Sequence, residues 1–457
     1  MSTTPTPALA ADNVLADSLK REATDLLQGL LRLDTTSPPG NERLAADYIA
    51  GVLTAEGIDS TIVEAAPGRA TIVARLKAAN PTGRPVLLMG HTDVVTVEAE
   101  KWERGPFSGD LVDGFIWGRG ALDMKGQVAG ELAAFLALKR AKLPLTRDVI
   151  FCAFADEEAG GEFGADWVWK EHRDLIDAEY AINEGGGSPF AIGGASFYTC
   201  QVGEKGSSRL LLTARGNPGH ASVPIPGTAM RNLGIALQRL HDWRPLMVIT
   251  APVRHLLQGI ADALGGDARM LIDGVLASDT PAWDDLAGLP LSDHDRAMLY
   301  AITHNTAVPT IVAGGQRINV IPSEVTLSVD GRLLPGEDPE AFRVAVQDAV
   351  GDAAEVTLES RGSGIAADPA SPFFDAIRST MHALQPESHL VPTLISGGTD
   401  ASLLPGVKVY GFFPIHSGER VALYDPLVHG HNERIHIDDL AIGARFVHDL
   451  VAAFCTS

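Results

Sequence analysis

The spacing of hydrophobic residues in the first part of the chain alternates between helix-like and strand-like segments. Apolar positions at helical spacing predict three helices, at residues 14–33, about 41–56 and about 125–141. Short apolar runs predict three strands, at residues 70–76, 85–89 and 148–155, the last two continuous enough to be buried on both faces. Strands that alternate with helices indicate an α/β fold, with a mostly parallel central sheet and flanking helices.

This pattern changes after about residue 195 and returns near residue 363. Between these points strands are predicted at residues 208–214, 310–312, 324–332 and 355–359, and helices at 227–240 and 339–350. These elements fit a sheet with two helices on one face. The glycine- and proline-rich stretch RGSGIAADPASP then precedes another helix at 373–384. We therefore expect a discontinuous α/β domain, residues 1–195 and 363–457, with an inserted α+β domain, residues 196–362.

Length and charge narrow the class of protein. The 457 residues are too many for one ordinary core, which agrees with two domains or three. Hydrophobic residues make up 45% and charged residues 21%, so a largely disordered chain is excluded. The formal net charge of −22 argues against nucleic acid as a partner, because phosphate binding needs basic patches.

The lack of a recognisable targeting signal and the small number of cysteines predict a cytoplasmic protein. The amino-terminal segment lacks the basic start and apolar core of a secretory signal. No apolar run approaches the roughly 20 residues that a membrane helix needs, so no membrane association is expected. The three cysteines fit neither a disulfide framework nor a CxxC metal knuckle, and they indicate reduced, buried thiols.

Chemically active side chains follow several of the predicted strands. His91 and Asp93, in the segment GHTDVV, come directly after the strand at 85–89. Two positions apart on a strand, their side chains share a face. Asp93 can then accept a hydrogen bond from one imidazole nitrogen while the other nitrogen binds a metal. A histidine and aspartate at this spacing are, on their own, more often structural.

Three further clusters supply carboxylates. Asp123 stands between a glycine-rich loop and a helix, where the commonest role of an aspartate is a helix cap. Glu157 and Glu158 follow the strand at 148–155, and they can share a site only beyond its carboxyl end, where ligands of open α/β sheets gather. Glu184 follows another short apolar run. Each cluster alone fits a cap or a solvated acidic turn.

Taken together, the clusters favour a metal site. The segment VHGHNERIHI adds His429, His431 and His436 as alternatives for one role. Mixed imidazole and carboxylate ligands favour a divalent first-row metal, with zinc as the default and cobalt or manganese as alternatives. Three carboxylates and one hydroxide would offset two divalent ions, which avoids the cost of burying net charge.

These segments resemble the dinuclear-zinc metallopeptidases that include acetylornithine deacetylase, succinyl-diaminopimelate desuccinylase, aminoacylase and the glutamate-releasing carboxypeptidases. The run of GHTDVV, PFSG and GRGALDMKG is followed by DEEAGG, NEGG and HGHNE in the family's order, and the resemblance covers nearly the whole chain. It implies a zinc-peptidase-like catalytic domain, an inserted lid domain and two divalent ions per chain.

The resemblance also implies a role for each candidate ligand. Asp123 would bridge the two ions, and the peptide bond after it would be cis. His91 and Glu184 would complete the shell of one ion. Glu158 and His429 would complete the shell of the other, the choice among the three histidines following the family's HGxNE spacing.

A mechanism follows from the resemblance. Asp93 would be the hydrogen-bond partner of His91, and Glu157 would be the general base. A water that bridges two cations loses a proton near neutral pH and becomes a nucleophile. Glu157 would accept that proton and later deliver it to the leaving nitrogen, serving first as base and then as acid.

Four residues outside these clusters would contact the substrate. The segment GNPGHASVP resembles the family's lid motif, which implies that His220 donates to the developing oxyanion. INVIPSE and DGRLLPG place Asn319 and Arg332 where family members hold the substrate's free carboxylate, and SGGTDAS resembles a substrate-binding loop around Gly398. Without the resemblance, His220, Asn319 and Arg332 would be a loop histidine, a turn asparagine and a surface arginine. The resemblance also allows a homodimer through the lid, with His220 acting in cis or in trans.

The substrate class rests on the length of the insertion. Residues 243–307 exceed a simple lid and resemble the branch of carboxypeptidase S and N-acyl-amino-acid hydrolases. We therefore predict a carboxypeptidase or N-acyl-amino-acid deacylase that cleaves an amide bond next to the free carboxylate of a small peptide or N-acyl amino acid. The alternatives are a dipeptidase or aminopeptidase on the same dinuclear centre, and a non-catalytic binding relative.

Overall fold

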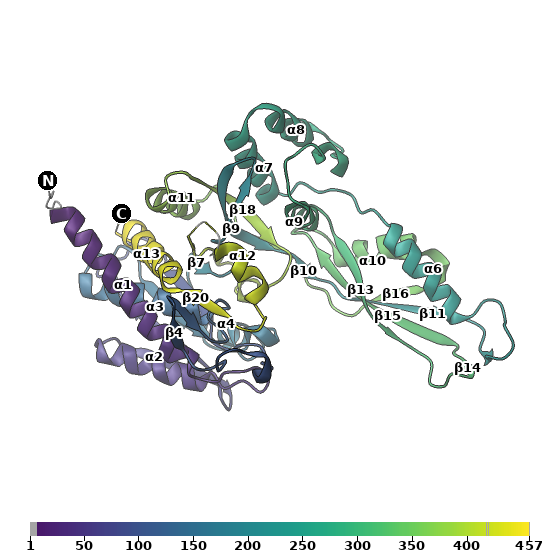
Figure 1. The fold of residues 1–457 in the computed structure, drawn as a ribbon, viewed down its shortest axis with the longest axis horizontal. Coiled ribbons are helices and arrows are strands. Elements are labelled where there is room, and N and C mark those ends of the chain that lie inside the picture. The colour runs from purple at the N-terminus through teal and green to yellow at the C-terminus, as the bar shows by residue number, and fades with distance from the viewer. Residues whose placement is uncertain (1–6, 417, 419, 457) are drawn as a thin grey trace. The chain divides into compact units, whose positions relative to one another are not determined.

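The computed structural model describes residues 7–416, 418 and 420–456, and the chain forms two compact units (Figure 1). The larger unit contains the chain up to Gln201, Ala367–Val391 and the chain from Thr399 onward. The smaller unit contains Val202–Ala366 and Pro392–Gly398. The division falls near the two points at which the hydrophobic pattern changes.

Two strands carry the chain from one unit into the other. β9 (Ala195–Glu204) crosses the boundary after Gln201, β18 (Ser388–Ile395) crosses the boundary after Val391, and the two strands pair with each other. The segment 392–398 was expected in the α/β domain, but it groups with the smaller unit because β18 continues beyond residue 391. This segment includes Gly398, one of the predicted substrate-binding residues.

The larger unit is built on the centre of a ten-stranded sheet with the order β1-β2-β6-β3-β7-β19-β9-β17. The four middle strands are parallel: β6 (Val149–Phe154), β3 (Val86–His91), β7 (Tyr180–Asn183) and β19 (Lys408–Gly411). Every residue of β3, β6 and β7 is buried, as expected for continuous apolar runs covered on both faces. The outer pairs are antiparallel. The predicted α/β fold with a mostly parallel central sheet is confirmed.

Helices cover this sheet (Figure 1). The helix α3 (Lys125–Ala141), predicted with the same bounds, contacts both α1 (Pro7–Leu31) and α13 (Ile437–Phe454). The remaining helices of this unit are α2 (Arg43–Ala55), α4 (Ala165–Glu171), α5 (Arg173–Ile176), α11 (Pro372–Leu384) and α12 (Arg420–Tyr424). Its remaining strands are β1 (Ser60–Ala66), β2 (Arg69–Leu76), β4 (Asp110–Val112), β5 (Phe115–Trp117), β8 (Pro189–Ile192) and β20 (Arg434–His436). Within the described residues, no helix is long and apolar enough to cross a membrane.

The smaller unit contains an antiparallel sheet with the order β10-β15-β11-β16, and β13 also pairs with β15. Buried and less buried residues alternate along β15, which presents Val325, Leu327 and Val329 to the two helices α6 and α10. The strands are β10 (Gly206–Ser207), β11 (Leu210–Arg215), β12 (Gly219–His220), β13 (Thr306–Ala313), β14 (Val320–Ile321), β15 (Glu324–Leu333), β16 (Glu355–Leu358) and β17 (Ile365–Ala366). The helices are α6 (Ala229–Asp242), α7 (Ala251–Leu264), α8 (Gly266–Ala277), α9 (Asp293–Thr303) and α10 (Pro339–Val350).

Candidate metal centre

The carboxyl ends of three neighbouring parallel strands bring the candidate residues together. β3 ends at His91, and Glu184 directly follows the last residue of β7. Glu157 and Glu158 lie just beyond the end of β6, in a turn of 3-10 helix. Asp123 comes two residues before α3. Side chains from distant parts of the sequence therefore meet at one edge of the sheet, as open α/β sheets favour.

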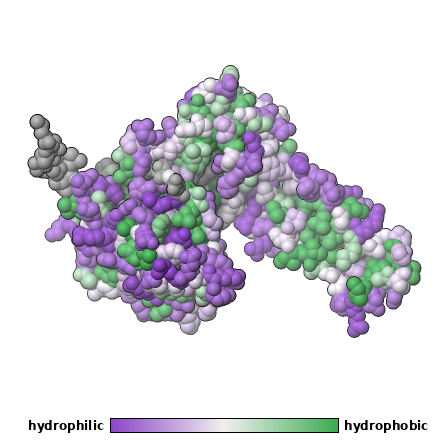
Figure 2. All heavy atoms as spheres, in the orientation of Figure 1, coloured by the Kyte–Doolittle hydropathy of each residue, from purple (hydrophilic) through white to green (hydrophobic). Residues whose placement is uncertain are grey.

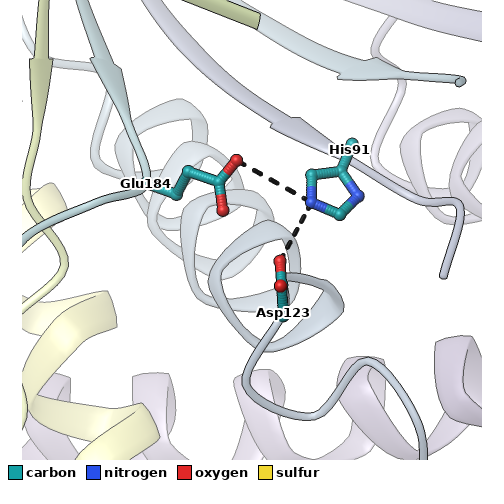
Figure 3. Close-up of side chains that lie close together, drawn as sticks. All are labelled: His91, Asp123 and Glu184. Carbon is teal, nitrogen blue, oxygen red and sulfur yellow. Dashed lines mark hydrogen bonds and ion pairs between the residues drawn. The ribbon is translucent and has the colours of Figure 1, made fainter. Parts of the chain in front are cut away.

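A first group of possible metal ligands surrounds the His91 imidazole, as Figure 3 shows. The Nε2 atom of His91 lies 3.1 Å from Asp123 Oδ1 and 3.8 Å from Glu184 Oε1. Both carboxylates point toward this nitrogen (Figure 3). One ligand atom from each of the three residues lies within 4.8 Å of the others.

A second group shares Asp123 with the first. The Nε2 atom of His429 lies 3.0 Å from Asp123 Oδ2 and 3.2 Å from Glu158 Oε2. Asp123 therefore offers one carboxylate oxygen to each group, which is the arrangement that a carboxylate bridging two cations requires. The peptide bond between Asp123 and Met124 is cis, as the resemblance implied.

The charges of these residues fit divalent metal ions. Burial raises the pKa of Glu184 well above its ordinary value and raises that of Glu157 to about 7. The Oε1 atom of Glu158 is buried, with no hydrogen-bond partner among the described residues. Because an orphaned buried carboxylate oxygen is costly, and the donors are imidazoles and carboxylates, the site suits cations such as zinc.

The raised pKa values of the two histidines also indicate that this site stabilises positive charge. Burial would lower the pKa of His91, but hydrogen bonds to Asp123 and Asp93 and the nearby carboxylates raise it well above the usual range. Hydrogen bonds to Asp123 and Glu158 raise the pKa of His429 to about 10. Each imidazole is thus held where positive charge is stabilised.

Glu157 lies beside the first ligand group but belongs to neither of the two groups. Its Oε2 atom is 3.9 Å from His91 Nε2. The backbone N–H groups of Glu157 and Glu158 donate to the two oxygens of Asp93, at 3.1 and 3.0 Å. The Nδ1 atom of His91 is 3.0 Å from the backbone carbonyl oxygen of Asp93 and 3.5 Å from its carboxylate. The Asp93 carboxylate therefore mainly fixes the turn that carries Glu157, and its carbonyl orients His91.

A buried ion pair that the sequence did not reveal supports the same turn. Asp156 has a φ of 71°, which is uncommon for a residue other than glycine. Its carboxylate accepts hydrogen bonds from Arg69 Nη2, at 2.6 Å, and from the N–H of Phe163, at 2.8 Å. Arg69 in turn donates to both oxygens of Glu42. These contacts bridge residues far apart in the chain, so no local pattern could have predicted them.

The structure distinguishes the three competing histidines. His431 Nε2 lies 3.0 Å from Glu98 Oε2. The Nδ1 atom of His436 accepts a hydrogen bond from Asp438 N and caps the start of α13. Of the three, His429 is the histidine that contacts the other candidate ligands, and its role as a metal ligand stays a prediction.

Comparisons with known proteins add to this geometry. A family model described as Peptidase family M20/M25/M40 matches residues 87–453, which is most of the chain. The chain belongs to this family. The family resemblance found from the sequence motifs is thereby confirmed.

Relatives in the M20 family match over nearly their full lengths. The N-fatty-acyl-amino acid synthase/hydrolase PM20D1 of Xenopus tropicalis is 26% identical over 96% of this chain and 86% of its own. Aminoacylase-1 of Sus scrofa is 27% identical over 90% of both chains. The solved M20 family metallo-carboxypeptidase Sso-CP2 from Sulfolobus solfataricus has a TM-score of 0.68 at 19% identity, covering 94% of this chain and 98% of that one. This structural likeness shows a shared fold.

The smaller unit of the M20 chain places two of the predicted substrate-binding residues together. The strand β12 pairs with β14 so that His220 lies opposite Val320. The N–H of Ala221 donates to the carbonyl oxygen of Asn319, at 3.0 Å. His220 and Asn319 therefore lie side by side on this two-stranded ribbon, and both are exposed.

Arg332 lies toward the other end of the same unit. β15 begins at Glu324, shortly after the ribbon, and Arg332 is its next-to-last residue. At roughly 3.3 Å per residue, Arg332 is about 26 Å from Glu324. One copy of this unit therefore does not bring Arg332 together with His220 and Asn319.

Gly398 lies in an exposed loop after β18. The next residue, Thr399, accepts a hydrogen bond from Asn183 Nδ2 through its Oγ1, at 3.0 Å. Asn183 directly precedes Glu184, so Thr399 is tied to the end of the strand that a candidate ligand follows.

The geometry of the second ligand group predicts that substitution of His429 and of His431 will affect the metal content differently. We expect His429→Ala to retain about one metal ion per chain where the wild type binds about two, because the second group then keeps only two ligands. His431→Ala should keep the wild-type content, since His431 contacts Glu98 instead. Metal analysis of the purified variants after dialysis checks this. The reverse order would move the ligand two residues along the chain.

Proposed function

We propose that this M20 chain hydrolyses the amide bond of an N-acyl amino acid or small peptide, next to the substrate's free carboxylate, with two divalent ions. Metal-dependent hydrolysis of an amide bond is the reaction class of the family. The observation that carries the proposal is the position of Asp123, which offers one oxygen to each of two ligand groups. Zinc is the proposed metal because imidazoles and carboxylates make up both groups.

The geometry supports each of the proposed ligands. His91, Asp123 and Glu184 would hold one ion, and Asp123, Glu158 and His429 would hold the other. When bound, the two ions would acidify a water molecule and polarise the carbonyl of the scissile amide.

Glu157 is the proposed general base and acid. It lies in neither ligand group, yet its carboxylate is 3.9 Å from the nitrogen at the centre of the first group. A carboxylate fixed beside the ions can take the proton of the attacking water on its Oε atoms and deliver it to the leaving nitrogen. Asp93 and Asp156 hold the turn that carries it, which limits the positions that the Glu157 carboxylate can adopt.

Arg332 is the proposed anchor of the substrate carboxylate, and the structure adds a partner to it. Its Nε donates to Asp330 Oδ1, at 2.7 Å, and its Nη2 to Asp330 Oδ2, at 3.2 Å. This contact fixes one edge of the guanidinium and leaves the Nη1 group and the second hydrogen of Nη2 for a substrate carboxylate. A planar fork held at one edge can present the remaining donors in a defined direction. Asn319 and Gly398 are the other proposed substrate contacts.

A homodimer through the smaller unit is part of the proposal. Among the described strands β13 pairs with β15 alone, so its other edge is open. Val308, Ile311 and Val312 on β13 are more than half exposed, and Figure 2 shows hydrophobic residues gathered on this unit. An open edge strand with exposed apolar side chains favours pairing with a second chain.

Dimerisation also bears on where His220 acts. Because about 26 Å separates Glu324 from Arg332 along β15, His220 and Arg332 of one copy are too far apart to contact the same small substrate. If both residues serve one site, they come from different chains. We therefore propose that His220 and Asn319 act in trans as donors to the oxyanion and the substrate carboxylate.

The curated relatives favour N-acyl amino acids over free peptides as the substrate. Both PM20D1 and aminoacylase-1 are named for acylated amino acids. A dipeptidase remains the second candidate, since the solved structure of human carnosine dipeptidase 1 has the same fold, with a TM-score of 0.65. Arg332 favours a substrate with a free carboxylate over the free amine that an aminopeptidase must hold. A cytoplasmic location is proposed from the three buried free thiols, which suit a reducing compartment.

Glu157→Gln should keep the wild-type metal content and lower kcat by about 10²–10⁴-fold, because proton transfer is lost while both ligand groups stay intact. Glu162→Gln is the control, since Glu162 is an exposed carboxylate three residues beyond the turn that carries Glu157. Steady-state kinetics on an N-acyl amino acid, together with metal analysis, test this. Near-normal turnover by Glu157→Gln would show that Glu157 is not the general base.

Arg332→Lys should lose discrimination between a substrate and its carboxyl-amide. We expect kcat/KM for the carboxylate substrate to fall about 10- to 100-fold, because lysine cannot hold Asp330 and grip a carboxylate with two parallel bonds. The rate on the amide should change little. Arg343→Lys, at an arginine paired with Glu340 on α10, is the control. Equal cleavage of both substrates by the wild type would contradict the proposal that Arg332 holds the substrate carboxylate.

Mixed dimers test the trans arrangement. Glu157→Ala and His220→Ala homodimers should each be nearly inactive. After subunit exchange half of the dimers are hybrids, and each hybrid has one complete site, so roughly a quarter of wild-type activity should return. Exchange verified by mass spectrometry without recovery of activity would place His220 in cis.

A further inference from the structure

A buried ion pair outside both ligand groups joins the loop that carries Asp123 to the loop that carries His429. Arg119 and Glu433 are 2% and 0% exposed, and Arg119 Nη1 donates to Glu433 Oε2 at 2.6 Å. Arg119 precedes Asp123 by four residues, and Glu433 follows His429 by four. The Arg119 guanidinium also lies over the ring of Trp102, at 5.3 Å. We call this pair the clasp.

The Glu433 side of the clasp fixes the backbone in front of Asp123. Its Oε1 accepts hydrogen bonds from the N–H groups of Leu122, at 2.7 Å, and Asp123, at 3.1 Å. Its Oε2 accepts from the N–H of Gly120, at 3.0 Å, as well as from Arg119. Each carboxylate oxygen therefore has two donors, and three of the four belong to the turn that ends at the shared ligand.

The Arg119 side of the clasp fixes the backbone of the loop that carries His429. Its Nη2 donates to the carbonyl oxygens of His429, at 3.2 Å, and Gly430, at 2.8 Å. His429 has a φ of 59°, which is uncommon outside glycine, and its side chain is 52% exposed. Packing of the His429 side chain therefore does little to fix this loop, and the clasp constrains its backbone directly.

We propose that Arg119 and Glu433 are positioning residues that preorganise the second ligand group, so that Asp123 and His429 already face each other before a metal ion arrives. This inference rests on the proposed two-ion site. The first ligand group depends less on the clasp, because its other members, His91 and Glu184, lie at the ends of strands β3 and β7. The clasp should therefore govern the affinity of the second ion more than that of the first.

Glu433→Gln tests the clasp with little change of shape. The amide nitrogen of glutamine must face two of the four donors, so two hydrogen bonds are lost. We expect affinity for the second zinc ion to fall about 10- to 100-fold, as for other residues that orient metal ligands. Affinity for the first ion should stay within about threefold. Titration of the metal-free chain with Zn²⁺ against a chromophoric chelator resolves the two steps.

Glu131→Gln is the matched control. Glu131 is also 0% exposed, and its carboxylate accepts a hydrogen bond from Gln127 within the same helix, α3. This variant changes an equally buried carboxyl group of the larger unit, so it reports what loss of such a group does to the fold. We expect both zinc affinities to stay at the wild-type values.

Arg119→Lys is the second variant, for the case that circular dichroism shows Glu433→Gln to be unfolded. Lysine keeps a cation beside Glu433, but one ammonium group cannot reproduce the fork that contacts Glu433 and two carbonyl oxygens. The same selective loss of the second ion is expected. Equal weakening of both ions, or a lower melting temperature of the metal-free chain with unchanged affinities, would overturn the positioning role. A wild type that binds a single ion would instead reject the two-ion site itself.

Discussion

Electrostatic repulsion among buried carboxylates is the constraint on which this site depends. Asp93, Asp123, Glu157, Glu158 and Glu184 converge on the carboxyl edge of the parallel strands, and each of the two ligand groups contains one histidine. Burial raises the pKa values of Glu157 and Glu184, and repulsion from the neighbouring carboxylates raises them further, because like charges so close together cannot all remain ionised in a poorly hydrated site. Cations would relieve this repulsion, and Asp123 is placed so that two of them could share one carboxylate.

The rest of the larger unit holds this crowded arrangement in position. The candidate ligands lie at strand ends or on short turns. Buried polar contacts hold these turns in place, as hydrogen bonding within a sheet would hold a strand. Asp93 accepts the two N–H groups of the Glu157–Glu158 turn, Arg69 holds Asp156 before it, and Glu433 holds the turn before Asp123. Because each contact joins segments far apart in the chain, the site and the fold of this unit stabilise each other. Removing one buried partner would leave an uncompensated charge.

The sequence predicted those features that depend on local pattern. The bounds of α3 and α10 were predicted correctly because apolar residues recur at helical spacing, and His91 was placed at a strand end because a continuous apolar run precedes it. β13 was predicted as 310–312 but extends over Thr306–Ala313, since most of its residues are exposed and no alternation marks them. The helices α7 to α9 were expected only as extra length in the insertion. Arg119 and Glu433 lie inside quoted motifs, yet their contact spans 314 residues, so only the fold could reveal it.

The most direct test of the central claim is a crystal structure of the zinc-loaded chain, with anomalous scattering measured at the zinc edge. A two-ion site predicts two anomalous peaks, about 3.5–4 Å apart, with one oxygen of Asp123 bound to each ion. His91 and Glu184 should contact one peak, and Glu158 and His429 should contact the other. A single peak, or a second ion held by His431 or His436 in place of His429, would contradict it.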